Sequence, residues 1–196
     1  MRKELTVDLF TTIKERRSCR SFVPEHVDDE TIATILRAAV WAPSAKNAQP
    51  WEFIVITNQE LKEKILAEAE ECKKIAIEKS GWKWLERYQV DFLPSVPVII
   101  AVVGNPERAG ADIFLEGGGM TYRDACAAAV QNMLLAAHAL GLGSLWFTLY
   151  RPEAMRSILG MQPGKVVVAL VCLGRPGEEP LQTKRKDALQ LTNFIR

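Results

Sequence analysis

Residues 42–56 read APSAKNAQPWEFIVI, and this stretch joins an expected helix to an expected strand. Upstream of it, Asp28 provides an acidic helix cap, and apolar residues recur at helical spacing from Ile32 until Pro43 prevents the helix from continuing. Downstream, residues 51–57 are β-branched and aromatic and follow a proline, which predicts a strand that leaves the loop.

The loop between this helix and this strand carries short hydrogen-bonding side chains, and two prolines restrict its path. Ser44, Asn47 and Gln49 could read the polar edge of a planar ring. An ordinary turn would use the same residue types, so the loop by itself leaves both interpretations open.

Helices and strands are intermixed along the rest of the chain. Helical patterns cover residues 59–79, 124–140 and 152–160, and the alanine-rich pattern of 124–140 is apolar nearly all round, which predicts a buried helix. Strand-like runs cover residues 96–103, 144–150 and 165–173. We therefore expect one three-layered domain that spans residues 1–196.

The composition limits the kinds of fold and binding partner that this chain can have. The chain has 196 residues and is 48% hydrophobic, which suits one domain with a sizeable core. Lys and Arg total 25 against 24 for Asp and Glu, so no net field attracts nucleic acid or an anionic membrane. The first ten residues contain no apolar signal region, and no run approaches the roughly 18 apolar residues of a spanning helix. We expect a soluble, cytoplasmic protein that binds neither nucleic acid nor membrane.

Two segments lack a clear period. Residues 81–92 (GWKWLERYQVDF) concentrate aromatic side chains and could form a lid or a partner surface. After Gly174 the chain is polar until apolar residues return between Leu189 and Ile195. A second subunit is the simplest place to bury that end, and docking on its own domain is the alternative.

The usual catalytic devices are absent from the sequence. It contains no GxGxxG after a strand, no P-loop and no HExxH, and neither His26 nor His138 has a catalytic companion. The four cysteines are scattered without a metal-binding spacing, although three arginines near Cys19 would lower the pKa of its thiol. We expect no catalytic side chain and no metal, so an enzyme built on this chain needs a cofactor.

The basic segment 16–20 (RRSCR) is the clearest binding motif. Three guanidiniums and the Ser18 hydroxyl within five residues suit a phosphate monoester, which arginine can bind in a bidentate manner. Arginine rather than lysine at every basic position, followed by the apolar pair Phe22 and Val23, argues against a merely solvated surface. The spacing alone still leaves both interpretations open.

Together, four motifs closely resemble the nitroreductase family of flavoproteins, from about residue 10 to 190. They are RRSCRSF (16–22), APSAKNAQPWEFIVI (42–56), the helix-to-strand passage 125–148, and LGRPGEE (173–179) followed by KRK (184–186). The resemblance implies an α+β three-layer fold with a mainly antiparallel sheet flanked by helices. It also implies an intertwined homodimer with FMN bound in each of two interface sites.

The resemblance also implies site residues. One subunit would hold the FMN phosphate and ribityl chain with Arg16, Arg17, Ser18 and Arg20, and Arg185 would join them at the phosphate. The other subunit would lend Pro43, Ser44, Ala45 and Asn47, while Trp146, Phe147 and Thr148 would lie along the isoalloxazine. Residues 81–122 would form a variable lid or substrate region, and the extension 175–196 would embrace the partner subunit.

The activity implied by the resemblance is that of an FMN-dependent NAD(P)H oxidoreductase. It would reduce nitroaromatic or quinone-type acceptors by a ping-pong, two-electron route, with NADH or NADPH as donor. The alternatives are a specialised relative, such as a reductive dehalogenase or a flavin-fragmenting enzyme, and a flavin-binding protein without turnover.

Overall fold

The computed structural model describes residues 8–196, and its centre is one antiparallel sheet. The four strands lie in the order β1-β2-β4-β3, and each neighbouring pair is antiparallel. Their bounds are β1 Trp51–Ile56, β2 Val98–Gly104, β3 Gly143–Phe147 and β4 Val166–Gly174. The four predicted strands are therefore present within three residues of their expected ends.

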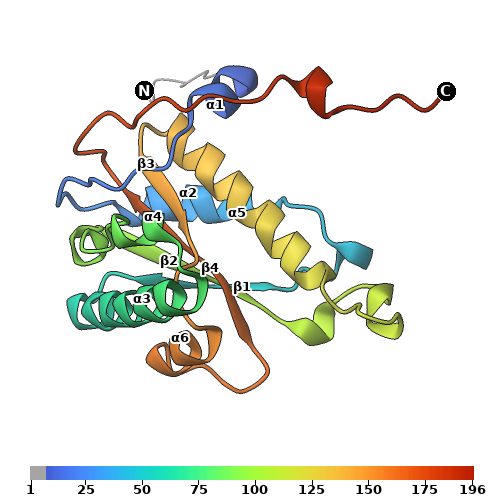
Figure 1. Cartoon of the computed structure of the whole chain (residues 1–196), viewed down its shortest axis with the longest axis horizontal. Coiled ribbons are helices and arrows are strands. Elements are labelled where there is room, and N and C mark those ends of the chain that lie inside the picture. The colour runs from blue at the N-terminus through green and yellow to red at the C-terminus, as the bar shows by residue number, and fades with distance from the viewer. Residues whose placement is uncertain (1–7) are drawn as a thin grey trace.

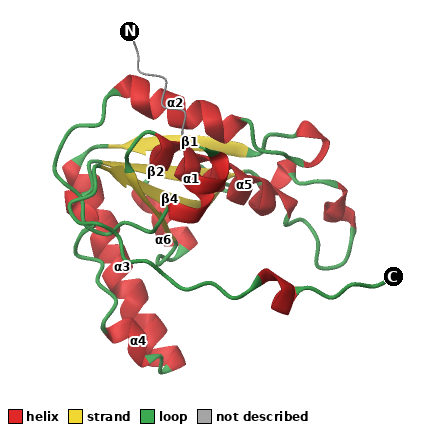
Figure 2. Cartoon of the chain, turned by 90° about the horizontal axis from the view of Figure 1, so that it is seen from above, coloured by secondary structure: helices red, strands yellow, loops and turns green. Residues whose placement is uncertain are grey.

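Helices cover both faces of this sheet, which confirms the predicted α+β, three-layer fold (Figures 1 and 2). They are α1 Leu9–Glu15, α2 Asp29–Val40, α3 Gln59–Ser80, α4 Lys83–Glu86, α5 Thr121–Ala139 and α6 Pro152–Ile158. Short 3-10 turns occupy several of the connections. The periodicity did not predict α1, because a helix of seven residues shows too few turns for a pattern.

Side chains on the central strand β2 alternate between two hydrophobic clusters. Val98, Ile100 and Val102 belong to the cluster that includes α2 and α5, whereas Ile99 and Ala101 belong to the cluster that includes α3 and α6. This alternation is the period of two that a strand imposes. Figure 2 shows α2 and α3 on opposite sides of the sheet, as the two clusters require.

Helix α5 is buried against the sheet, as its composition predicts. Cys126, Ala129, Val130, Met133 and Ala137 are all fully buried. Small alanine side chains allow a helix to approach its neighbours closely, and Figure 1 shows α5 running across the sheet.

The expected helix boundary before the 42–56 stretch is confirmed. The Asp28 carboxylate accepts a hydrogen bond from the Thr31 amide at 2.8 Å and caps α2, which ends three residues before Pro43. The following helix begins at an Asn58 cap and ends at Gly81, whose φ of 65° suits glycine in a left-handed C-terminal cap.

The region 81–122 is divided by the buried strand β2 and is not one continuous segment. Its second part is closed by Asp112, whose carboxylate accepts hydrogen bonds from the Met120 amide at 2.7 Å and the Thr121 hydroxyl at 2.6 Å. The hydrogen bonds from Thr121 hold the pKa of Asp112 down at about 2. The role of residues 81–122 as a lid or substrate region stays a prediction.

The last sixteen residues of the described chain, 181–196, are exposed throughout. Figure 1 shows this tail running away from the body of the domain. Leu189 is 70% exposed, Phe194 is 65% exposed and Ile195 is 94% exposed. Within residues 8–196, no helix is long and apolar enough to cross a membrane.

Candidate functional site

The basic segment runs beside the first residues of β3. The Cys19 amide donates to the Ser144 carbonyl at 2.9 Å, and Ser18 forms a parallel bridge with Ser144. The approach is close, because a Cβ atom added to Gly143 would lie 2.8 Å from the Cys19 sulfur. A glycine at position 143 therefore allows the segment to lie against the strand.

The arginines of this segment line a cavity of about 730 Å³. Its walls include Arg16, Arg17, Ser18 and Arg20, and Arg185 from the tail lies with them. The structure thus brings together the five residues that the resemblance assigns to the phosphate end. In the part of the chain that the structure describes, no carboxylate lies within ion-pair distance of these four arginines.

Among these four arginines, Arg16 is the one whose charge is destabilised by its surroundings. It is half-buried, and no carboxylate among residues 8–196 lies within ion-pair distance of it. Burial, and then the charges of Arg17 and Arg185, lower the pKa of the Arg16 guanidinium. Crowded like charges without a counterion favour the binding of an anion, because the anion relieves their mutual repulsion.

Two buried polar atoms beside the cavity lack a hydrogen-bond partner among residues 8–196. They are Nε of Arg17 and Oγ of Ser144. Both residues line a second cavity of about 420 Å³, which Arg16 and His138 also border. Unsatisfied buried donors are costly and rare. The donor set and the positive charge fit a phosphate ester with a hydroxylated chain.

The loop after α2 is strained where it is most exposed. Lys46, Asn47 and Gln49 have φ values of 48°, 54° and 45°, in the left-handed region that side-chain-bearing residues rarely adopt. The Ser44 hydroxyl accepts a hydrogen bond from the Gln49 amide at 3.0 Å and holds the loop in this form. Such strain is found most often at ligand sites.

The predicted loop residues Pro43, Ser44 and Ala45 line a small cavity of about 230 Å³ with the first turns of α5. Asn47 lies exposed in the same loop. The second cavity of the basic segment instead borders His138 and Gly141, at the other end of α5. A helix of 19 residues is about 28 Å long, so one chain does not bring the two sets of residues to one small ligand.

The third predicted group, Trp146 to Thr148, lies where β3 ends. The Phe147 side chain is 1% exposed and packs in the cluster with α3 and α6, so only its backbone can face a ligand. Trp146 packs partly against the other cluster, and the Thr148 side chain is exposed. None of the three lines the cavities described above.

Comparison with known proteins assigns the chain to a family. The sequence profile of the Nitroreductase family matches residues 13–175, which is most of the chain. The chain belongs to the nitroreductase family. The family assignment inferred from the four motifs is thereby confirmed.

Several known proteins are similar to this nitroreductase-family chain over much of its length. A protein of Archaeoglobus fulgidus with the provisional name NADH dehydrogenase/NAD(P)H nitroreductase is 34% identical over 173 residues, which cover 85% of this chain and 84% of that protein. The iodotyrosine deiodinase of Hydra vulgaris is 30% identical over 183 residues, which cover 87% of this chain and 66% of the deiodinase.

Solved structures of similar chains share the fold. A BluB-like flavoprotein from Clostridium difficile 630 superposes with a TM-score of 0.80 and 26% identity, covering 97% of this chain and 100% of the flavoprotein. A structure from Desulfovibrio desulfuricans, described provisionally as a nitroreductase in complex with FMN, has a TM-score of 0.75 and 27% identity and covers 97% and 98% of the two chains.

Within this nitroreductase-family site, the expectation for Cys19 is wrong. Its side chain is 2% exposed, and its thiol donates to the Ser21 carbonyl at 3.0 Å. Burial raises the pKa of the Cys19 thiol, and the opposing effect of Arg20 is smaller. The sequence places the arginines near Cys19 but does not show that its sulfur faces the core.

Sequence reasoning also missed an aromatic contact with the basic segment. The Arg20 guanidinium lies over the Tyr88 ring, 5.3 Å from its centroid. Trp84 meets Tyr88 edge-on at 6.0 Å, and Trp82 lies 5.9 Å from Trp84. The aromatic segment 81–92 therefore reaches the basic cavity. The sequence did not predict this contact, because residues 81–92 follow neither a helical nor a strand periodicity.

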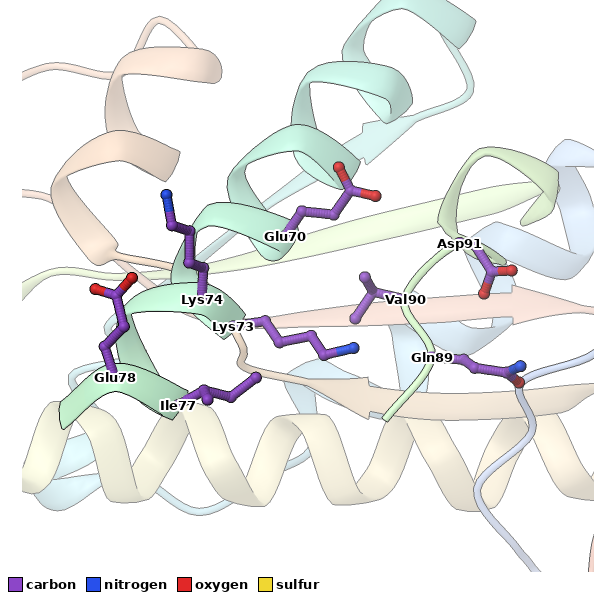
Figure 3. Close-up of a pocket in the computed structure, with 8 residues that line it drawn as sticks. All are labelled: Glu70, Lys73, Lys74, Ile77, Glu78, Gln89, Val90 and Asp91. Carbon is purple, nitrogen blue, oxygen red and sulfur yellow. The ribbon is translucent and has the colours of Figure 1, made fainter. Parts of the chain in front are cut away.

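Beyond Tyr88 lies a further hollow of about 530 Å³ between α3 and residues 89–91. Figure 3 shows Lys73 and Ile77 extending from α3 toward Gln89 and Val90. Its rim mixes three carboxylates (Glu70, Glu78 and Asp91) with two lysines (Lys73 and Lys74). Gln89 also borders the basic cavity, but the near balance of charge here does not favour a phosphate.

Proposed function

We propose that this nitroreductase-family chain is a homodimeric, FMN-dependent oxidoreductase that takes electrons from NADH or NADPH. The observation that carries the proposal is the cavity in which four arginines gather with two glutamates, Glu178 and Glu179, while no described carboxylate lies within ion-pair distance of any of the four. The family relationship, and the FMN complex of the similar protein from Desulfovibrio desulfuricans, support the identity of the anion.

In this proposal the four arginines hold the phosphate of FMN, and Ser18 donates to it or to the ribityl chain. Arg16 contributes most, because it is half-buried and already repelled by Arg17 and Arg185. The orphaned Arg17 Nε and Ser144 Oγ offer further polar contacts to an oxygen-rich chain. A phosphate there would pair with guanidiniums that form no described ion pair.

The proposed dimer follows from the length of α5. The Pro43–Asn47 loop and the basic segment lie at opposite ends of that helix, so both sets can contact one flavin only if two copies contribute. The exposed apolar residues of the tail support a second copy as the surface that covers them.

Bound FMN would supply two-electron transfer between a nicotinamide and an acceptor. The chain would position the flavin, hold Trp146 to Thr148 along it, and place positive charge at its phosphate. No titratable side chain of the site is needed to activate a nucleophile. Nitroaromatic or quinone-type compounds are the proposed acceptors, reduced in a ping-pong sequence.

The deciding experiment begins with the absorbance spectrum of the purified protein. We expect a flavin spectrum, release of FMN on denaturation, and about one FMN per chain in a dimer measured by light scattering. Anaerobic NADH or NADPH should then bleach the flavin, and a nitroaromatic or quinone should restore it. A protein that takes up no FMN contradicts the cofactor, and a bound flavin that neither nicotinamide bleaches contradicts the reaction.

A further inference from the structure

A buried carboxylate on α3, which the proposed function does not use, binds the chain just beyond β3. The Glu68 side chain is 5% exposed. It accepts three hydrogen bonds from Arg151: from the backbone amide at 2.8 Å, from Nε at 2.9 Å and from Nη2 at 2.6 Å. This arrangement combines a bidentate ion pair with a backbone contact, so it restricts both the side chain and the main chain of Arg151.

Arg151 lies at the end of a short turn that follows Trp146 to Thr148. Within this turn the Tyr150 amide donates to the Thr148 carbonyl at 3.0 Å. The buried Tyr150 hydroxyl donates to the Val167 carbonyl of β4 at 3.2 Å. The turn is therefore fixed at two points, by Glu68 from α3 and by β4 from the sheet.

Helix α3 is a rigid support for this contact. Ile65 and Ala69, which flank Glu68 on the helix, are fully buried in the cluster beneath the sheet. A buried carboxylate is tolerated only when hydrogen bonds and an opposite charge compensate its desolvation. Replacement of the Glu68 carboxylate by an amide would leave one accepting oxygen in place of two and so leave at least one of the three Arg151 donors without its acceptor.

We infer that Glu68 is a positioning residue which, through Arg151, holds the Trp146–Thr148 segment in place against the flavin. The flavin part of this inference rests on the proposed function. The fixing of the segment does not, because it follows from the three hydrogen bonds and the turn between Thr148 and Arg151.

The first test uses flavin-free protein and hydrogen exchange at the amides of residues 148–151. In Glu68→Gln these amides should exchange about tenfold faster or more, because an amide side chain cannot accept all three hydrogen bonds. Glu153→Gln is the matched control, since it removes an exposed carboxylate that pairs with Arg156 within α6. Equal exchange in Glu68→Gln and in the native protein overturns the inference.

The second test uses the flavin-loaded protein and a signal that stability alone does not change. We expect Glu68→Gln to alter the visible circular dichroism of the bound flavin and to lower kcat more than it raises KM for the nicotinamide. Arg151→Lys, which keeps the backbone contact and the charge, should give a smaller change of the same kind. A lower melting temperature with native exchange and a native flavin signal would mean that the pair only stabilises the fold.

The two tests also separate the inference from the proposed function. If the native protein takes up no flavin, the proposed function fails, and the exchange experiment still decides whether Glu68 holds the segment. If Glu68→Gln does not fold, exchange in Arg151→Ala, which loses both guanidinium hydrogen bonds to Glu68, supplies the comparison, and native exchange there overturns the inference.

Discussion

The Arg17 guanidinium donates to the side-chain oxygen of Gln182 at 2.6 Å, across 165 positions of sequence. This hydrogen bond ties the start of the tail to the basic segment, and it places Arg185 in the same cavity as Arg16. Beyond Gln182 every tail residue is exposed. The tail therefore has one part that completes a site on its own chain and another part that nothing among residues 8–196 covers.

Arg16→Gln should weaken FMN binding by about tenfold to a hundredfold, because it removes a charge-assisted contact from a partly desolvated site. Titration of FMN into flavin-free protein measures the change. Riboflavin, which lacks the phosphate, should bind Arg16→Gln and native protein alike. Arg108→Gln, an exposed arginine on a different loop, is the control for lost charge. Equal losses for FMN and riboflavin would contradict the phosphate assignment.

Removal of residues 187–196 should weaken the dimer but keep Arg185. The deletion takes away the exposed apolar residues Leu189, Leu191, Phe194 and Ile195, which we propose to contact the second copy. Sedimentation over a range of protein concentrations measures the dimer dissociation constant. The full-length variant Arg185→Gln is the comparison and should lose FMN affinity while the dimer persists. An unchanged dissociation constant after the deletion would show that the tail end contributes nothing to association.

Gly143→Ala should destabilise the fold by about 1–3 kcal/mol, because the added methyl group overpacks the contact between β3 and the basic segment. The new Cβ would lie 2.8 Å from the Cys19 sulfur and 2.9 Å from the Cys19 Cβ. Chemical denaturation measures the loss. Cys19→Ala in the same background removes the closer contact and should recover part of the stability. No recovery would mean that the cost arises elsewhere.

The closed form of the 110–121 loop should survive acid down to about pH 2. Hydrogen bonds from Thr121 lower the pKa of Asp112 from 3.8 to about 2. The stabilisation is therefore fully present above the unfolded value of 3.8 and disappears as the pH falls through about 2. Hydrogen exchange at the Met120 and Thr121 amides, followed against pH, reports the opening of the loop.

Asp112→Ala should remove this pH dependence and increase exchange at those amides already at neutral pH, because it removes the oxygen that accepts both the Met120 and the Thr121 amide hydrogen bond. Asp91→Asn, an exposed acid outside the loop, controls for the lost charge. A loop that opens near pH 4 in the native protein would contradict the lowered pKa.

Local features of the fold could be predicted because neighbouring residues determine them. The Asp28 cap, the period-two strands and the apolar alanine pattern of α5 each depend on residues a few positions apart. Helix α1 could not be predicted in this way, because it is short and exposes Leu9, Phe10 and Ile13. The strand order β1-β2-β4-β3 could not be read from periodicity either, since pairing depends on packing between distant segments.

The same division holds for the site. The sequence by itself determined that three arginines and a serine stand within five residues, because covalent connection keeps them together in any fold. Only the tertiary structure decided that Arg185 faces the same cavity, that Pro43 to Asn47 lie at the far end of α5, and that the Cys19 sulfur is buried. These facts depend on long-range packing, which sets the distance between segments and the desolvation of each group.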